Sequence, residues 1–163
     1  MDSLLAQTFT DIEIICVDDG SSDGTLAVLR SYEHKDRRVR VFTQSNLGAG
    51  AARNHGLKYV RGKYVQIVDA DDFFDKDMLE KFLQRARQTD ADIVVCRARN
   101  YNNTTGETLL TDWTVRAAML PQKAVFNRHD IADKIFQWSI GWAWDKFYKT
   151  SFIKKHNLRF QSL

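Results

Sequence analysis

Short apolar segments alternate along the first 99 residues of this chain with segments of helical periodicity. Such an alternation is typical of α/β folds in which helices cover a parallel sheet. It predicts an α/β fold with a mostly parallel sheet. The expected strands span residues 12–17, 39–42, 64–68 and 93–96, and the expected helices span residues 25–33, 49–60 and 76–88.

The pattern changes after Arg99. Residues 100–106 predict a loop, residues 107–115 an exposed strand, and residues 129–138 and 151–157 two helices. All four tryptophans fall in this last third of the chain. The first residues resemble the C-terminal part of a helix with no strand before it.

Size and charge exclude several classes of protein. A chain of 163 residues predicts one domain with a sizeable core. Its 24 basic and 21 acidic residues give a net charge of +3, too balanced to predict binding to nucleic acid. No apolar run reaches the roughly 18 residues of a membrane span, and no signal peptide is visible. Cys16 and Cys96 lie in apolar runs, which predicts buried thiols rather than a disulfide.

Three acids, Asp69, Asp71 and Asp72, follow directly after the strand expected at 64–68. Carboxylates this close repel one another unless a cation lies among them. Hard divalent cations such as Mg²⁺ or Mn²⁺ prefer oxygen ligands and often bind substrate phosphates as well. The carboxyl ends of strands are also where α/β folds bind ligands. The stretch therefore predicts a metal-assisted nucleotide site, with a polar turn that caps the next helix as the alternative.

Two further stretches lie after expected strands. Asp18 and Asp19 could accept hydrogen bonds from a base N–H or a ribose hydroxyl, while Asp23 or Thr25 caps the following helix. The stretch 46–54 opens a helix and carries two glycines of a dinucleotide fingerprint. Arg53 stands where the third small residue should be, which argues against that fingerprint. We expect Arg53 to pair with a diphosphate or a site acid.

Aromatic residues cluster with polar ones near the end of the chain. Aromatic faces suit the apolar faces of sugar rings, but they also serve ordinary core packing. Trp142 and Lys146 are the better candidates for a wet cleft on the acceptor side, and Asp145 is expected to be structural. Among the histidines, His55 is a weak candidate for a place near the site.

The ordered set of these motifs resembles the bacterial family 2 glycosyltransferases, which have the GT-A nucleotide-diphosphate-sugar fold. The matching stretches are residues 3–25, 46–56, 62–72 and 144–148. The resemblance implies a single GT-A-like domain over residues 1–163. Residues 1–99 would form its nucleotide-binding part, and residues 100–163 part of the acceptor side.

The resemblance also implies roles for individual residues. Asp18 and Asp19 would contact the uracil and ribose of a nucleotide near Arg53. Asp69 and Asp71 match the family's Asp-x-Asp element: Asp69 would reach the ribose or the metal, and Asp71 would hold Mg²⁺ or Mn²⁺. The cation would stabilise the departing diphosphate.

The implied function is transfer of a sugar from a nucleotide-diphosphate sugar, a UDP-sugar above all, to a glycan or lipid-linked acceptor with inversion. Relatives commonly build cell-surface polysaccharide, which implies a cytoplasmic protein, peripheral at the inner face of the membrane. Against the family pattern, the opening strand is expected to be missing and the catalytic base to lie beyond Leu163. The chain would then be a fragment of impaired activity, able to self-associate through an exposed sheet edge.

Two other functions stay open at this point. A nucleotidyltransferase would also need an α/β sheet, a metal and carboxylates, but usually shows a Gly-rich basic loop after its first strand. A noncatalytic nucleotide-binding or assembly fragment would use its exposed aromatic residues to bind partners.

Overall fold

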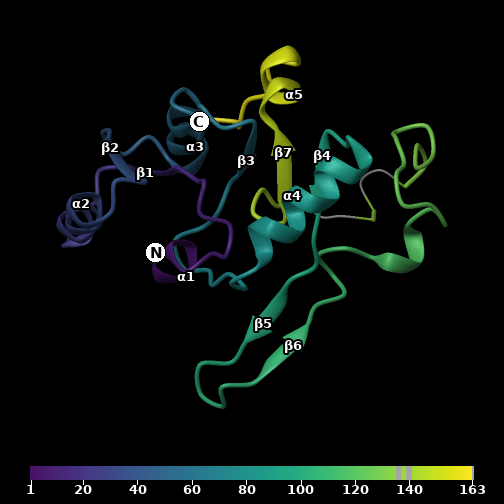
Figure 1. The fold of residues 1–163 in the computed structure, drawn as a ribbon, viewed down its shortest axis with the longest axis horizontal. Coiled ribbons are helices and arrows are strands. Elements are labelled where there is room, and N and C mark those ends of the chain that lie inside the picture. The colour runs from purple at the N-terminus through teal and green to yellow at the C-terminus, as the bar shows by residue number, and fades with distance from the viewer. Residues whose placement is uncertain (135–136, 139–140, 163) are drawn as a thin grey trace. The chain divides into compact units, whose positions relative to one another are not determined.

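The computed structural model describes residues 1–134, 137–138 and 141–162 and divides them into two compact units (Figure 1). Residues 7–65 and 149–163 form one, which we call the β1 unit, and residues 1–6 and 66–148 form the other, the α4 unit. The strands β3 (Tyr64–Gln66) and β7 (Lys146–Lys149) run across the boundaries between them. The predicted division of function at residue 99 stays a prediction.

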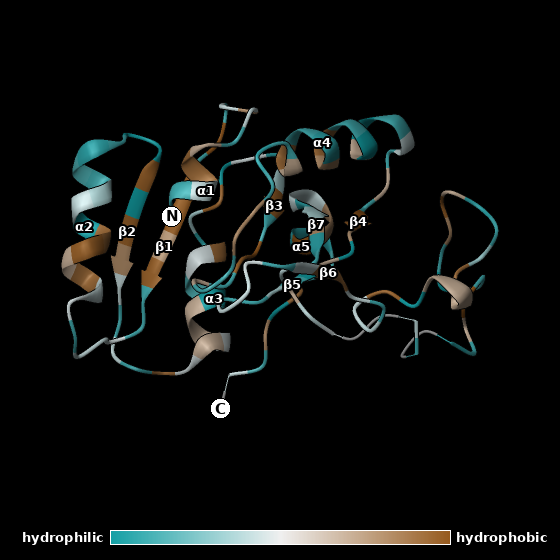
Figure 2. Ribbon diagram, turned by 90° about the horizontal axis from the view of Figure 1, so that it is seen from below, coloured by the Kyte–Doolittle hydropathy of each residue, from teal (hydrophilic) through white to brown (hydrophobic). Residues whose placement is uncertain are grey.

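The β1 unit is built on two parallel strands between two helices. β1 (Ile14–Asp18) pairs with β2 (Val39–Thr43), with Ile14 opposite Val39 and Asp18 opposite Thr43. Figure 2 shows both strands coloured as hydrophobic over most of their length, with α2 beside β2 and α3 beside β1. Side chains on β1 and β2 alternate between the two faces of the sheet, and Ile14, Val39 and Val41 are buried in the core. The register brings the carboxyl ends of both strands to one edge, where α/β folds bind ligands.

Small residues let α3 approach β1 closely. α2 spans Thr25–Lys35 and α3 spans Ala49–Leu57. A Cβ on Gly56 would lie 3.4 Å from Cγ2 of Val17 and 3.7 Å from Cγ2 of Ile15. These are ordinary packing distances, so α3 lies close to the side chains of β1 at this position. Residues 12–17, 25–33, 39–42 and 49–60 are therefore confirmed as strand, helix, strand and helix, within a few residues at each end.

The C-terminal residues return to the β1 unit. Thr150 donates its backbone N–H to the Lys63 carbonyl at 2.9 Å and its hydroxyl to the Gly62 carbonyl at 2.8 Å. α5 follows over Thr150–Lys155 and confirms the helix predicted near 151–157. The residues after α5 then run beside α3, where Asn54 hydrogen-bonds the Phe160 backbone.

The α4 unit is centred on an amphipathic helix. α4 (Met78–Thr89), which confirms the helix predicted at 76–88, buries Phe82, Leu83 and Ala86. The Phe82 ring stacks on Phe147 of β7, with centroids 5.2 Å apart and planes 7° from parallel. β7 pairs antiparallel with β4 (Ile93–Val95). The same unit contains the short α1 (Asp2–Leu5).

Residues 99–138 differ from expectation. β5 (Arg99–Tyr101) and β6 (Thr108–Leu110) form an antiparallel hairpin (Figure 1), so the predicted loop at 100–106 begins within a strand. A 3₁₀ turn, η1, follows at Ala117–Met119. The helix predicted at 129–138 is wrong: its described residues form turns, and 135–136 lie outside the described residues. On α2, Val28 is 55% exposed and does not belong to the core.

Sheet direction departs from the predicted pattern as well. Only β1 and β2 form a parallel pair among the three pairs described here, while β4–β7 and β5–β6 are antiparallel. The fold is α/β as predicted, but its sheets are mixed rather than mostly parallel. The strand β7 was not among the expected strands, because its residues Lys146–Lys149 alternate poorly.

Candidate functional site

Asp18 ends β1 with a carboxylate that is almost fully buried. The residue is 5% exposed. Its Oδ2 accepts a long hydrogen bond of 3.4 Å from the Ser21 backbone N–H. Its Oδ1 is buried and has no hydrogen-bond partner among the residues that the structure describes. A buried acceptor left without a donor costs about 1–3 kcal/mol, so this oxygen is ready to receive an N–H or O–H group.

Asp19 shapes the loop that leads into α3. Its Oδ1 accepts the Gln44 side-chain amide at 2.7 Å and the Leu47 N–H at 3.0 Å, and its Oδ2 accepts the Gly48 N–H at 2.8 Å. The hydrogen bond from Leu47, followed by that from Gln44, lowers the pKa of Asp19 below its ordinary 3.8. Since a carboxylate offers about four acceptor positions, most of this one is used within the loop.

Gln44 links Asp19 to His55. Its amide nitrogen donates to Asp19, so its oxygen faces His55, whose Nδ1 lies 2.8 Å away. An amide oxygen only accepts, and His55 must therefore carry its proton on Nδ1. His55 also packs beside Tyr59, with ring centroids 5.5 Å apart. Gln44 therefore connects His55 to Asp19, and Gln44 is a residue that the sequence did not single out.

Two glycines in the same turns adopt positive φ angles. Gly20 has φ +72°, and a Cβ there would lie 2.7 Å from the Asn46 nitrogen. Gly48, with φ +85°, precedes the first turn of α3. Both positions favour glycine because an L side chain rarely adopts such angles. They allow the β1 end and the loop before α3 to approach each other through backbone.

Arg53 lies on the second turn of α3 and faces an aromatic ring. Its guanidinium carbon is 5.5 Å from the centroid of Phe160, within the range of a cation–π contact. The next residue, Asn54, hydrogen-bonds the Phe160 backbone. Sequence reasoning identified Arg53 but not Asn54, whose partner is 106 positions away.

The acidic turn belongs to the α4 unit. The Asp72 N–H lies 3.4 Å from the Asp69 carbonyl across residues 70–71, with Asp69 half-buried and Asp71 exposed. Burial, and then the negative charges of Asp71 and Asp69, raise the pKa of Asp72. The charged form of Asp72 is therefore disfavoured first by burial and then by the two neighbouring acids.

The donor chemistry of this turn fits a hard divalent cation. No group of three His, Cys, Asp or Glu side chains within residues 1–134, 137–138 and 141–162 could hold a metal by itself. Mg²⁺ normally needs only one or two protein carboxylates, because substrate phosphates and water complete its octahedron. Asp69 and Asp71 supply such oxygens, and a cation between them would relieve the repulsion felt by Asp72.

Trp142 and Lys146 also lie in the α4 unit. The indole of Trp142 lies 6.2 Å, between centroids, from Trp113 and from Trp144, and Trp142 and Trp113 are 42% and 41% exposed. Lys146 Nζ donates to the Trp142 carbonyl at 2.7 Å and to Asp145 Oδ1 at 2.6 Å. The structure thus joins the two predicted acceptor-side residues by a direct contact.

Asp145 is the buried partner of Lys146. It has no exposed surface, and burial raises its pKa despite the neighbouring ammonium. Its Oδ2 is a second buried acceptor without a partner among the described residues. Full burial fits the structural role predicted for Asp145.

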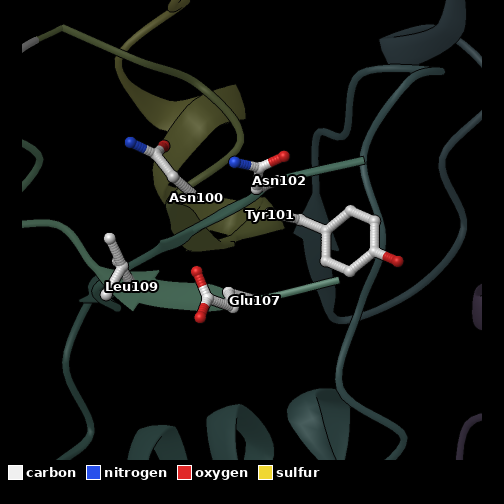
Figure 3. Close-up of a pocket in the computed structure, with 5 residues that line it drawn as sticks. All are labelled: Asn100, Tyr101, Asn102, Glu107 and Leu109. Carbon is white, nitrogen blue, oxygen red and sulfur yellow. The ribbon is translucent and has the colours of Figure 1, made fainter. Parts of the chain in front are cut away.

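A shallow hollow of 340 Å³ lies on the β5–β6 hairpin (Figure 3). Its walls come from both strands and the turn, with Asn100 opposite Leu109 in the register. It contains none of the residues predicted for the site. The lining residues are Asn100, Tyr101, Asn102, Glu107 and Leu109.

The family model described as "Glycosyl transferase family 2" matches residues 1–159. EpsH of Bacillus subtilis, which carries a glycosyltransferase name, is 32% identical over 161 residues, covering 98% of this chain and 45% of EpsH. The cholesterol galactosyltransferase of Borreliella burgdorferi is 32% identical over 168 residues, covering 96% of this chain and 45% of that protein.

Solved structures of S. aureus TarS share the fold. TarS 1–349 in complex with UDP-GlcNAc superposes with a TM-score of 0.72 at 26% identity, covering 99% of this chain and 43% of that chain. TarS 1–349 without ligand gives a TM-score of 0.73 at 24% identity, covering 98% and 44%. The chain spans less than half the length of these relatives. The predicted GT-A fold is confirmed by this likeness.

Proposed function

The chain belongs to glycosyl transferase family 2, and from that membership we propose that it binds a UDP-sugar and transfers the sugar to an acceptor hydroxyl. The observation that carries this proposal is the Asp18 carboxylate, with its buried and unpartnered Oδ1 at the carboxyl end of β1. Uracil N3–H and the ribose hydroxyls are the donors that such an oxygen lacks. Bound nucleotide would thus remove the cost of burying it.

Similarity to a structure that contains a UDP-sugar favours a uridine nucleotide as the ligand. The TarS structure with UDP-GlcNAc shows that a protein 26% identical to this chain binds a UDP-sugar. We assign base and ribose binding to Asp18, with Asp19 holding the adjacent loop and offering its remaining acceptor position. Arg53 is assigned to the diphosphate, since a guanidinium suits phosphate oxygens through its fork of N–H donors.

Asp69 and Asp71 are the residues that would hold Mg²⁺ or Mn²⁺. A divalent cation supplies Lewis-acid stabilisation of charge on a departing diphosphate. Asp72 is less suited to bind the cation, because its raised pKa reflects burial as well as its charged neighbours.

The proposed reaction is a single displacement. The acceptor oxygen forms a bond to the anomeric carbon, while the bond from that carbon to the diphosphate oxygen breaks. The electron pair leaves with UDP, and the acceptor proton passes to a general base. Attack opposite the leaving group inverts the anomeric configuration.

Trp142 and Lys146 are proposed as acceptor-side residues. Half-exposed indoles offer flat apolar faces to the C–H faces of a sugar ring. The Lys146 ammonium is fixed by Asp145 and by the Trp142 carbonyl, so it is already oriented as a donor. A glycan or lipid-linked glycan is the acceptor class that this chemistry suits.

Two further expectations stay proposals. No helix of the described part of the chain is long and apolar enough to cross a membrane. We place the protein at the cytoplasmic face of the membrane because the family commonly builds surface polysaccharide there. We also propose that the protein self-associates through an exposed sheet edge.

Calorimetry with UDP and Mn²⁺ tests the proposal. We expect UDP to bind only with Mn²⁺ present, and Asp71→Ala to abolish the metal dependence together with most of the affinity. Asp18→Asn should weaken UDP binding about tenfold or more, because a hydrogen bond to a charged group contributes roughly 1.5–3 kcal/mol. Asp23→Asn is the matched control, since the Asp23 carboxylate accepts the Thr25 N–H at 2.9 Å where α2 begins.

The outcomes separate the alternatives. Tighter binding of UTP than of UDP-GlcNAc would favour a nucleotidyltransferase. Full affinity in Asp18→Asn would remove the central assignment. No binding of any nucleotide would leave the noncatalytic assembly role as the better explanation.

A further inference from the structure

A single side chain of α3 fastens the segment 158–161 of the β1 unit. Asn54 Nδ2 donates to the Phe160 carbonyl at 2.8 Å, and Asn54 Oδ1 accepts the Phe160 N–H at 2.9 Å. Both polar groups of the Phe160 backbone are thus satisfied as they would be by a neighbouring strand. Two short bonds in this arrangement hold the residue in one orientation.

The helix face that meets this segment is specialised at each position. Gly50, Arg53 and Asn54 are spaced i, i+3 and i+4, so they share one side of α3. A Cβ on Gly50 would overlap the Gln161 carbonyl oxygen. The missing side chain therefore lets the segment lie directly on the helix, which brings the Phe160 ring under the Arg53 guanidinium.

Packing alone would not require a cation over the ring. A long Arg side chain on a helix samples many rotamers, and ordering it for a ligand costs about 0.5–1.5 kcal/mol. A contact through the flat face of the guanidinium restricts its plane without itself occupying an N–H donor. A ring held by two backbone hydrogen bonds is a rigid support for this purpose.

We propose that Asn54 and Phe160 are positioning residues for Arg53, which they hold ready to meet the diphosphate of a bound UDP-sugar. This inference rests on the proposed function, because it takes Arg53 as a diphosphate contact. The Asn54 hydrogen bonds orient the Phe160 ring, and the ring orients the guanidinium. Neither positioning residue needs to touch the nucleotide.

A double-mutant cycle measured by calorimetry tests the proposal. Phe160→Leu should weaken UDP binding about two- to fivefold, the range of an exposed cation–π contact. Asn54→Ala should have a similar effect, and Phe160→Tyr should retain the wild-type affinity. In an Arg53→Ala background, both the Phe160→Leu and Asn54→Ala changes should have no further effect on UDP binding.

Two controls separate positioning from stability. Phe152→Leu removes a ring from the same unit that contacts His156 instead, and it should leave UDP affinity unchanged. Uridine, which lacks the diphosphate, should bind wild type and Phe160→Leu equally when titrated by NMR. A variant that merely loosened the fold would weaken both ligands.

The inference is overturned if wild type binds UDP through Asp18 while Phe160→Leu binds as well as wild type. It is equally overturned if Phe160→Leu loses as much affinity in the Arg53→Ala background. If wild type binds no UDP at all, the proposed function fails first and this inference fails with it.

Discussion

The Asp19 carboxylate and the Gly48 backbone N–H are joined by a hydrogen bond of 2.8 Å across 29 positions of sequence. This contact ties the end of β1 to the residue that precedes α3. Gly48 has a positive φ, so the N–H can turn toward Asp19 before the helix begins. A carboxylate that looked like a ligand contact in the sequence therefore also organises the loop before the Arg53 helix.

Replacing Asp19 by Asn should loosen this loop. An amide has only one acceptor oxygen, and its NH₂ group would face one of the donors now bound by the carboxylate. We expect faster hydrogen exchange at the Leu47 and Gly48 amides and a lower melting temperature. Asp23→Asn is the control, because Asp23 bonds the Thr25 N–H at the start of α2 and its replacement should leave both amides protected.

Acid should reproduce the effect of Asp19→Asn in the wild-type chain. The pKa of Asp19 is lowered in the fold, so its contribution is present above the unfolded value of 3.8 and is lost as pH falls through the folded pKa. NMR titration should show the Leu47 and Gly48 amide shifts moving together below that value. Shifts that move at the ordinary pKa of an isolated Asp would contradict the assignment.

Gln44 predicts a fixed tautomer for neutral His55. The side-chain amide gives its NH₂ to Asp19 and its oxygen to His55, which must respond with Nδ1–H. Nitrogen shifts of the ring should report this tautomer in wild type. In Gln44→Leu the preference should disappear, and a wild-type ring protonated on Nε2 alone would show that the amide is reversed.

Sequence patterns predicted the strands and helices of the β1 unit well because each is determined by residues close together in the sequence. Short apolar segments predicted strands at residues 12–17 and 39–42, and a segment rich in small residues predicted the helix at 49–60. The same reasoning placed Asp18, Asp19 and Arg53 after strands or in a helix opening. It could not tell that most acceptor positions of Asp19 are used within the protein, because the donors at 44–48 only become visible through the parallel register.

Long-range contacts explain the failures. Phe160 meets Asn54 across 106 positions, and no spacing rule predicts that pairing. β7 pairs with β4 although residues 146–149 lack a clean alternation. The helix predicted at 129–138 had periodicity but, at least in its described residues, formed turns. Tertiary pairing decided these segments, and local propensity did not.

The Asp145–Lys146 pair predicts a pH-dependent defect. Lys146→Met leaves a carboxylate with no exposed surface and without its ammonium partner, so the pKa of Asp145 should rise further. Breaking a buried pair by removing one partner typically costs about 3–5 kcal/mol. Urea unfolding near neutral pH should show a loss of this size.

The sign of the pH effect follows from the raised pKa. A carboxyl with a folded pKa above its unfolded value favours the fold when protonated, and this advantage is lost as pH rises through the folded pKa. Lys146→Met should therefore lose less stability at mildly acidic pH than at neutral pH. The double variant Asp145→Asn, Lys146→Met should recover stability at neutral pH. An equal loss at both pH values would mean that the pair contributes no charge-dependent stability.

Gly50→Ala is expected to destabilise the β1 unit although alanine favours helices. In an open helix this change would stabilise by about 0.5–1 kcal/mol. Here the new Cβ overlaps the backbone oxygen of Gln161, which cannot rotate away as a flexible side chain would. Overpacking against backbone costs about 1–3 kcal/mol, so the net change in the free energy of unfolding should be a loss.

Hydrogen exchange locates the Gly50→Ala effect. The Phe160 amide, now bound to Asn54, should lose protection because the segment must move off the helix. Gly141→Ala is the control, since a Cβ there would meet no atom of the described residues within 4 Å. A Gly50→Ala protein that gains stability and keeps the Phe160 amide protected would show that the segment does not lie on α3 in solution. Since Arg53 shares that helix face, the same result would remove the ring from beneath its guanidinium.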